Sequence, residues 1–381
     1  MTEGAFRNFY RGKTVLVTGH TGFKGSWLTI WLRELGAKVV GVALDPPTEP
    51  NHFSTARLSS RMTHVESDVR DMKRLQAIFA EHRPEVVFHL AAQAVVRRSF
   101  VEPRRTFEVN VMGTVNVLDA SARCETVRGV VMVTSDKCYR NVGGDQAYRE
   151  GDELGGLDPY GASKACAELV TAVYQDSRFQ EASSGRALAI ASVRAGNVIG
   201  GGDWASYRII PDTVRAITTG TDVFLRLPGA TRPWQHVLEP LSGYLWLGAL
   251  LIEAPEHYAS AWNFAPRDPR LLTVGEIVTR VLELWSPDRT RLVVEQDDSG
   301  IEALRLVLDW QKARTALNWE ATWDVDEALK ATVEWYRRFY DRAGDDVYAL
   351  SVGQIDAFTD SARRRGAAWA GTAAPSMAVT A

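Results

Sequence analysis

The first part of the chain alternates short apolar runs with longer segments in which apolar residues recur every three or four positions. The apolar runs predict six β-strands, at residues 13–18, 38–44, 64–66, 85–90, 129–134 and 187–193. Helical spacing predicts helices at residues 24–35, 71–82, 104–123 and 159–176. Apolar strands separated by helices are typical of a parallel sheet covered on both faces, so we expect a doubly wound α/β fold.

The pattern changes after Arg194, where glycines and prolines separate shorter elements. We expect residues 195–362 to form a smaller, mixed α/β domain for the substrate, with some segments returning to the sheet of residues 1–194. Amphipathic helices are predicted at residues 273–285 and 325–340. The small, repetitive residues at 363–381 predict a disordered tail.

Composition limits the classes of function. The 381 residues are 45% hydrophobic and 24% charged, with a net charge of −3, which gives no general reason to expect a nucleic-acid partner. The N-terminus resembles no signal peptide, and no apolar run is long enough to span a membrane. The three cysteines, Cys124, Cys138 and Cys166, have no zinc-like spacing. We therefore expect a cytoplasmic protein with reduced thiols, no membrane partner and no metal.

A glycine motif follows the first predicted strand and opens the first predicted helix. Gly19, Gly22 and Gly25 are spaced for a tight turn, close approach of backbone to a pyrophosphate, and packing of helix on strand. Asp45 lies 20 residues after Gly25, where a carboxylate accepts hydrogen bonds from the ribose of NAD. This arrangement predicts a Rossmann-type domain with NAD as its cofactor.

Other polar residues near this motif have two interpretations each. His20 and Lys24 contact phosphate or form a solvated edge, and Asp68 contacts the adenine or is a turn carboxylate.

Two further motifs suggest a catalytic group. Tyr160 and Lys164 lie four residues apart on a predicted helix, so they share a face, and an ammonium near a phenol favours the phenolate. In a chain that also carries a dinucleotide-binding motif, such a tyrosine is a candidate catalytic base. Thr134, Ser135, Asp136 and Lys137 follow the fifth strand and add a carboxyl and an amine. A nicotinamide enzyme that only moves hydride needs no such pair, whereas one that also eliminates water does.

These motifs together resemble the extended short-chain dehydrogenase/reductase superfamily and, within it, the CDP-glucose 4,6-dehydratases. The resemblance covers roughly residues 6–340. It rests on VTGHTGFKGSWL (17–28), TSDKCY (134–139), GGLDPYGASKACAELV (155–170), SVRAGNVIGGGDWA (192–205), RPWQHVLEPLSGY (232–244) and WNFAPRD (262–268). The Asp-Lys pair distinguishes this group, since related dTDP-glucose dehydratases have Asp-Glu there and sugar epimerases have neither.

The resemblance implies a nucleotide-linked glucose as substrate and a role for each motif. Tyr160 takes the proton of the C4 hydroxyl while the C4 hydride passes to NAD, and Ser135 and Lys164 orient this step. Lys137 is the candidate base at C5, and Asp136 is the candidate acid for the departing C6 hydroxyl. Further cofactor contacts are implied for Phe23, Lys24, Leu90, Ala91, Ala92, Asn110 and Thr134. Substrate contacts are implied for Gln93, Asn197, Trp204, Arg208, Arg232, Gln235 and His236, and Arg suits phosphate.

Several alternatives stay open. Trp204, Arg208, Trp234, Gln235 and His236 are equally compatible with core or hinge positions. Leu304 and Val307 replace residues that are more often polar in the family, which leaves the nucleotide base undecided. A dehydratase for another nucleotide hexose, a sugar-nucleotide 4-epimerase and a non-catalytic NAD-binding regulator are the competing functions. The resemblance also implies a homodimer or homotetramer that pairs through the helices near 104–123 and 158–177.

Overall fold

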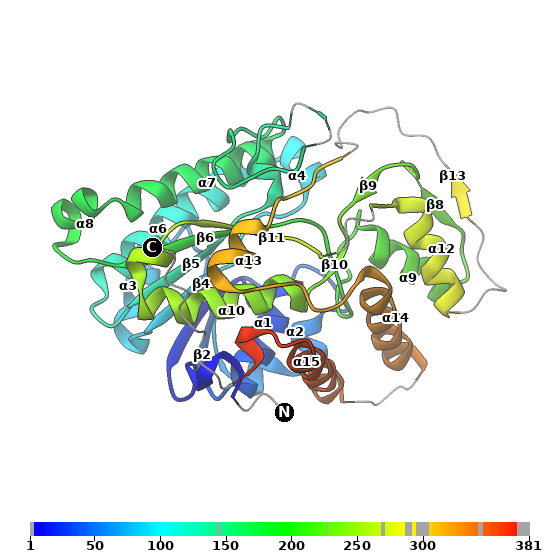
Figure 1. Cartoon of the computed structure of the whole chain (residues 1–381), viewed down its shortest axis with the longest axis horizontal. Helices are drawn as coiled ribbons and strands as arrows, with labels where there is room; N and C mark the ends of the chain where they lie inside the picture. The colour runs from blue at the N-terminus through cyan, green and yellow to red at the C-terminus, as the bar shows by residue number, and fades with distance from the viewer. Residues whose placement is uncertain are drawn as a thin grey trace.

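A parallel sheet forms the centre of the fold. A computed structural model describes residues 4–141, 143–144, 146–225, 227–267, 271–285, 292–294, 305–341 and 346–371. Within this described part of the chain, the largest sheet has seven strands in the spatial order β11-β6-β5-β4-β1-β2-β3, and all neighbours are parallel (Figure 1). The doubly wound fold class expected from the sequence is therefore confirmed.

The six predicted strands form within two residues of their predicted bounds. A seventh, β11, comes from far along the chain and pairs with β6 at the sheet edge. The strands are β1 (Thr14–Thr18), β2 (Lys38–Ala43), β3 (Thr63–Glu66), β4 (Val86–His89), β5 (Gly129–Val133), β6 (Ala189–Ala195) and β11 (Ala261–Phe264).

Helices cover both faces of this sheet. One face packs against α3 (Met72–His82), α6 (Gly113–Arg123) and α7 (Pro159–Gln175). The other packs against α1 (Phe23–Glu34) and α10 (Leu238–Glu253). The first fifteen residues of α10 are buried, because the helix is apolar on all sides and lies between the sheet and further helices (Figure 1).

The predicted helix 104–123 is interrupted. It consists of α5 (Pro103–Phe107), a π-helical turn η3 (Glu108–Met112) and α6, and α4 (Val96–Val101) precedes it. A π turn widens the helix by one residue, and such turns are frequent at functional sites. The side chain of Asn110 lies in this turn and is buried.

A second, smaller group of elements lies beside the carboxyl ends of the strands (Figure 1). Its helices are α9 (Ile209–Thr219), α12 (Val274–Trp285) and α14 (Val325–Asp341), the last two within one residue of their predicted bounds. Its short strand pairs are β7 (Val198–Ile199) with β10 (Gln235–His236), β9 (Thr231–Arg232) with β12 (Leu272–Thr273), and β8 (Val223–Leu225) with β13 (Leu292–Val294).

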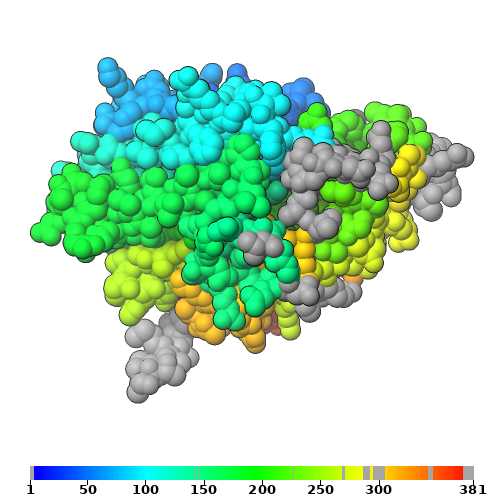
Figure 2. Space-filling model, turned by 90° about the horizontal axis from the view of Figure 1, so that it is seen from above, coloured from blue at the N-terminus to red at the C-terminus, as the bar shows by residue number. Residues whose placement is uncertain are grey.

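Short helices complete the described chain. They are α2 (His52–Thr55), α8 (Ser177–Ser184), α11 (Pro255–Tyr258), α13 (Gln311–Leu317) and the turns η1 (Ala5–Asn8), η2 (Leu58–Ser60) and η4 (Asp136–Cys138). Figure 2 shows α7 and α8, in green, lying across one face of the molecule beside the cyan elements α4 to α6. No helix in the described ranges is long and apolar enough to cross a bilayer.

The prediction of a disordered tail from residue 363 is wrong for its first part. Helix α15 (Val347–Arg364) packs on α1, and a turn η5 (Ala368–Ala370) follows it. Trp369 is fully buried and stacks on Phe6, with ring centroids 5.1 Å apart. A single tryptophan thus anchors a segment whose composition is otherwise typical of a tail. The remaining positions, 372–381, lie outside the described residues.

Candidate functional site

The glycine loop joins the carboxyl end of β1 to the first turn of α1. Gly19 has a φ of 75°, and a Cβ at this position would lie 2.7 Å from the backbone nitrogen of Ala91. A Cβ on Gly25 would lie 2.2 Å from the carbonyl oxygen of Gly19. Only glycine fits either position. This packing places the first backbone N–H groups of α1 at the carboxyl end of β1, where they stabilise an anion. These residues therefore fit a dinucleotide pyrophosphate.

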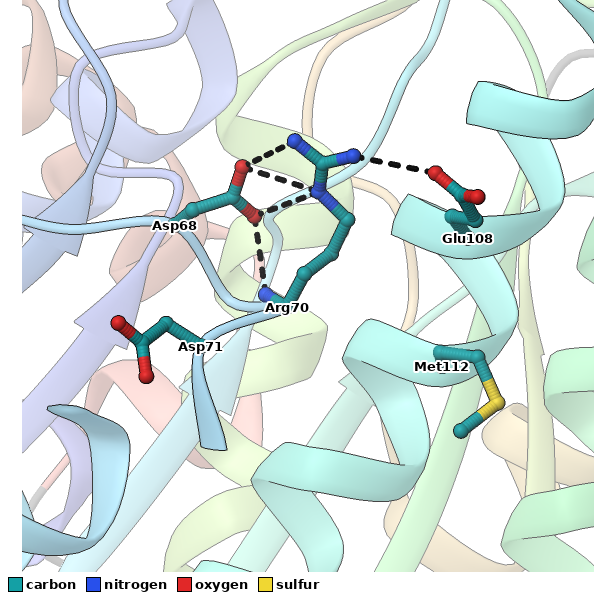
Figure 3. Close-up of a pocket in the computed structure, with 5 residues that line it drawn as sticks. All are labelled: Asp68, Arg70, Asp71, Glu108 and Met112. Atoms are coloured by element: carbon teal, nitrogen blue, oxygen red, sulfur yellow. Dashed lines mark hydrogen bonds and ion pairs between the residues drawn. The ribbon is translucent and has the colours of Figure 1, made fainter. Parts of the chain in front are cut away.

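Two acidic residues follow the next strands. Asp45 is exposed two residues beyond β2. Asp68, beyond β3, is paired with the Arg70 guanidinium at 2.7 Å, which lowers the pKa of Asp68, and Arg70 also reaches Glu108 at 3.2 Å (Figure 3). These three residues line a pocket of about 460 Å³ together with Asp71 and Met112. Asp45 and Asp68 thus follow the carboxyl ends of β2 and β3, on the same side of the sheet as the glycine loop after β1.

The loop after β4 carries Leu90, Ala91 and Ala92 and is tied to α7 through Asn110. The Asn110 amide accepts a hydrogen bond from the Gln93 backbone N–H at 2.8 Å and donates to the Ser163 hydroxyl at 2.8 Å. The Gln93 side chain, a candidate substrate contact, donates to Thr106 and accepts from the backbone N–H of Val95. The structure thus gives Gln93 internal partners, so its position stabilises this loop.

Close packing at the start of α7 brings two of the motifs together. The Asp158 carboxylate caps the helix by accepting from the Gly161 N–H at 2.9 Å, and Pro159 occupies the first turn. A Cβ on Gly161 would lie 2.7 Å from the carbonyl oxygen of Lys137. The absent side chain therefore lets η4 approach the helix and places Asp136 beside Tyr160. Sequence reasoning did not assign this role to Gly161.

The side chains of Tyr160, Ser135 and Asp136 form a buried cluster. Their exposed fractions are 8%, 8% and 5%. The Ser135 hydroxyl donates to Asp136 Oδ1 at 2.9 Å and accepts from the backbone N–H of Lys137 at 3.2 Å, and its side chain acts to lower the pKa of Tyr160. Burial raises the pKa of Tyr160 to about 12 and also raises the pKa of Asp136. These shifts differ from the phenolate expected beside Lys164 and favour a neutral tyrosine.

A buried ion pair between Glu168 and Arg194 accepts a hydrogen bond from Thr134 and lies within electrostatic reach of Lys164. The Lys164 ammonium donates to the Val133 carbonyl at 3.3 Å, and burial lowers the pKa of Lys164 to about 8 against the opposing charge of Glu168. Glu168 pairs with Arg194 at 2.7 Å and accepts from the Thr134 hydroxyl. The carboxylate thus holds the end of β5 in place and sustains the charge of Lys164.

Two further side chains, Lys24 and Tyr244, lie within electrostatic reach of the cluster. Lys24 holds its Nζ atom 5.7 Å from the ring centroid of Tyr244. Burial and the charges of Arg208 and Lys164 lower the pKa of Lys24 to about 8, against the opposing charge of Asp136. By accessible surface, the Lys24 residue is half-buried. Tyr244 on α10 is fully buried, and its hydroxyl has no hydrogen-bond partner among the described residues. Nothing in the apolar sequence of α10 marked Tyr244 as a candidate.

The substrate-side candidates divide into two groups. The first group lies near the cluster. Arg232 is buried and lies within electrostatic reach of Asp136. Arg208 pairs with Asp203 at 2.9 Å and lies within electrostatic reach of Tyr160, and Asn197 is half-buried next to Gly196. A Cβ on Gly196 would lie 3.3 Å from Asp136 Oδ2, so this loop borders the cluster directly.

The second group belongs to the core. Trp204 packs on Trp335 and Tyr336 and donates to the Tyr340 hydroxyl, so the structure does not bring it to the cluster. His236 is fully buried between Trp27 and Trp323. Gln235 is buried and donates to the Phe264 carbonyl, while its Oε1 atom has no partner in the described chain.

Leu304, where the family pattern departs, lies outside the described residues. Val307 is described, and its carbonyl accepts from the Tyr148 N–H.

The geometry agrees with comparisons to known proteins. A family model described as GDP-mannose 4,6 dehydratase matches residues 16–332. The chain belongs to this family. It is also 44% identical over 359 residues to the CDP-glucose 4,6-dehydratase of Salmonella typhimurium strain LT2, an alignment that covers 94% of this chain and 99% of that protein. The family indicated by the motifs is thereby confirmed.

More distant relatives and solved structures are similar over most of the chain. The dTDP-glucose 4,6-dehydratase of an Actinoplanes species is 26% identical over 85% of this chain and 97% of its own length. Among solved structures, the dTDP-glucose 4,6-dehydratase of Streptomyces venezuelae with NAD bound superposes with a TM-score of 0.71 at 25% identity, covering 85% and 97% of the two chains. The UDP-glucose 4-epimerase of Thermotoga maritima gives 0.71 at 26% identity, covering 85% and 99%.

Proposed function

We propose that this 4,6-dehydratase family member uses NAD to convert CDP-D-glucose into CDP-4-keto-6-deoxy-D-glucose. The observation that carries the proposal is the buried cluster that brings the candidate elimination acid, Asp136, within electrostatic reach of the candidate oxidation base, Tyr160. An epimerase needs Tyr160 but not Asp136. The identity to the Salmonella enzyme over nearly the whole chain supports CDP-glucose as the substrate.

In this proposal, the cofactor site lies along the carboxyl ends of the parallel strands. Gly19, Gly22, Phe23 and Gly25 hold the pyrophosphate, and Asp45 accepts from the ribose. Asp68 lies beside the adenine, and Leu90, Ala91, Ala92, Asn110 and Thr134 line the path to Tyr160 and Lys164. Bound NAD would supply the hydride acceptor for C4 and the hydride donor for C6.

The remaining residues act on the sugar. Asp136, buried and with a raised pKa, suits the acid that protonates the C6 hydroxyl. Lys137, half-buried on the same turn, is the candidate base at C5. Arg232 and Arg208 provide positive charge for the diphosphate, and Asn197 borders the same space.

A mass measurement tests the proposal. Purified protein is incubated separately with CDP-glucose and with the dTDP, UDP and GDP sugars, and the nucleotide sugars are then weighed by mass spectrometry. Loss of one water from the CDP substrate alone is the expected result. Loss from another nucleotide sugar would replace the substrate, and no loss from any of them would contradict the dehydratase mechanism. Because the reaction regenerates its cofactor, we also expect the protein to purify with NAD.

Assembly and location are part of the proposal. The elements α4 to α7 lie on one face of the molecule (Figure 2), and they carry exposed apolar side chains, among them Phe100, Val101, Met112, Leu169 and Val173. We expect this face to pair two copies of the chain, as a homodimer or within a homotetramer. A cytoplasmic location fits its reduced cysteines. The division at residue 194 between cofactor and substrate domains also remains a proposal.

A further inference from the structure

The side chain of Lys24 ends in an ammonium group that has no hydrogen-bond acceptor among the described residues. Lys24 lies in the first turn of α1, one residue before Gly25, and is half-buried. Its Nζ atom lies over the ring of Tyr244, 5.7 Å from the centroid, and Tyr244 is fully buried on α10. An aromatic face attracts a cation without using any of its three N–H donors. The ring therefore stabilises the position of the charge and gives it no counter-ion.

The ammonium extends from the glycine loop toward the candidate catalytic residues. The charges that act on it are those of Arg208, Asp136 and Lys164. Asp136 follows β5, and Lys164 on α7 donates to the last residue of β5. In the sheet, β4 separates β5 from β1, and the glycine loop follows β1. Lys24 therefore reaches along the carboxyl ends of these strands, from the proposed pyrophosphate site toward Tyr160.

The nicotinamide half of NAD has to follow the same direction in the proposed function, on which this inference rests. Its pyrophosphate lies at the glycine loop, and its ring exchanges hydride with C4 of the sugar, whose hydroxyl lies at Tyr160. The adenosine half lies on the other side of the loop, because its candidate partners Asp45 and Asp68 follow β2 and β3. The Lys24 ammonium is therefore a charge on the nicotinamide side.

A charge at this place distinguishes the two forms of the cofactor. The nicotinamide ring has a positive charge when it is oxidised and no charge when it is reduced. A fixed cation therefore repels the oxidised ring and has little effect on the reduced ring. At an effective dielectric constant of about 20, two unit charges several ångströms apart change such an equilibrium by at least about tenfold.

The other charged groups near Lys24 do not cancel this repulsion. Arg208 and Lys164 are cations themselves, but Arg208 pairs with a carboxylate at 2.9 Å and Lys164 lies within electrostatic reach of another. Asp136 is the carboxylate that acts on Lys24. Burial raises the pKa of Asp136, which favours its neutral form, and a neutral Asp136 is also what the elimination requires.

We propose that Lys24 favours the reduced form of the bound cofactor and thereby promotes oxidation at C4. In that oxidation a hydride, which is two electrons and a proton, leaves C4 for the nicotinamide ring, and the hydroxyl proton leaves to the candidate base, Tyr160. Oxidation of a secondary alcohol by NAD is unfavourable at neutral pH. Return of the hydride to C6 is favourable, because elimination leaves a C5–C6 double bond conjugated to the C4 carbonyl. Lys24 thus assists the unfavourable half of the cycle.

Competition between NAD⁺ and NADH measures this preference without any sugar. The holoenzyme is dialysed at pH 7 against defined mixtures of the two forms, and the bound cofactor is then released by denaturation and quantified by chromatography. The bound ratio of NADH to NAD⁺, divided by the free ratio, equals the dissociation constant of NAD⁺ divided by that of NADH. In Lys24→Met we expect this quotient to fall at least about tenfold, which lowers the reduction potential of the bound couple by about 30 mV.

Three variants serve as controls. Lys24→Arg keeps the charge and should retain most of the preference. Lys38→Met removes the same charge from an exposed lysine at the amino end of β2, the opposite end of the sheet, and should leave the quotient unchanged. Lys24→Gln is a second neutral variant and takes the place of Lys24→Met if the latter unfolds at a lower denaturant concentration.

Other roles of Lys24 give different results. A contact to the cofactor pyrophosphate would weaken NAD⁺ and NADH equally, since both contain it, and a contact to the sugar diphosphate would weaken CDP binding in calorimetry. An unchanged quotient in the neutral variants, with either of these effects or with none, overturns the proposal. A wild type that retains neither form of the cofactor overturns it too. Failure of the proposed function is recorded separately, as a wild type that releases no water from CDP-glucose while the competition still reports on Lys24.

Discussion

The buried ion pair of Glu168 and Arg194 provides the clearest test of how the active-site elements are held together. We predict that Glu168→Gln, which keeps the shape of the side chain and removes its charge, destabilises the fold strongly. The pair joins α7, which carries Tyr160 and Lys164, to β6. Through Thr134 and Ser192 the same carboxylate also contacts the end of β5 and the middle of β6.

The size of the effect follows from burial and from the contacts that remain. The side chains of Arg194 and Glu168 are 4% and 3% exposed, so water cannot replace the lost charge. Arg194 keeps its hydrogen bonds to the Tyr139 hydroxyl at 2.7 Å and the Glu150 carbonyl at 3.0 Å, but neither partner is charged. Removing one partner of such a pair costs about 3–5 kcal/mol because the other charge is left uncompensated.

Urea unfolding followed by circular dichroism measures this free energy. Asp119→Asn is the matched control, because it removes the acidic partner of an exposed pair with Arg123 at 2.9 Å. An exposed helical pair of this type contributes about 0.3–0.5 kcal/mol. We therefore expect a loss in Glu168→Gln that is several times the loss in the control.

A double variant separates charge from shape. Glu168→Gln combined with Arg194→Met removes both charges, and we expect it to be less destabilised than the sum of the two single changes by about 1–3 kcal/mol. The reasoning is refuted if Glu168→Gln costs less than about 1 kcal/mol, or if the two changes simply add.

Three further predictions address other parts of the molecule. Gly19→Ala places a Cβ 2.7 Å from the Ala91 nitrogen at a φ of 75°, so the variant should purify with little NAD, and a normal NAD content would contradict the loop assignment. Trp369→Ala removes a fully buried ring and should lower the free energy of unfolding by about 3–5 kcal/mol, whereas no change would show that the segment contributes nothing. Burial raises the pKa of Glu239 in the folded state to about 8, above its value in the unfolded chain. Glu239 therefore loses its proton at lower pH in the unfolded chain than in the folded protein. The stability that the neutral group contributes falls as pH rises from about 4.5 to 8. The stability difference between the wild type and Glu239→Gln should shrink over that range in urea titrations, and a constant difference would refute the shift.

Local patterns predicted much of the fold. Apart from the edge strand β3, the strands up to β6 are apolar runs that are largely buried, and the glycine motif lies at the carboxyl end of the first of them, as expected. The π turn at Glu108–Met112 was not predicted, because one extra residue in a helical turn does not disturb the helical period enough to be recognised. Trp369 was assigned to a disordered tail because the residues around it in the sequence are small. Burial of its ring in the core orders this segment, and local sequence does not show whether the core has space for the ring.

The sequence by itself determined which chemical groups this protein has and which elements carry them. Periodicity and motif spacing are local properties, so they placed Tyr160 on a helix and Asp136 after a strand. Only the tertiary structure decided that Asp136, Lys24 and Tyr244 lie within electrostatic reach of one another beside Tyr160. These contacts join segments far apart in the chain, and they depend on close approaches such as that of Gly161 to the Lys137 carbonyl. The physical reason is packing, because the distance between side chains on different elements depends on how the whole core fills its space.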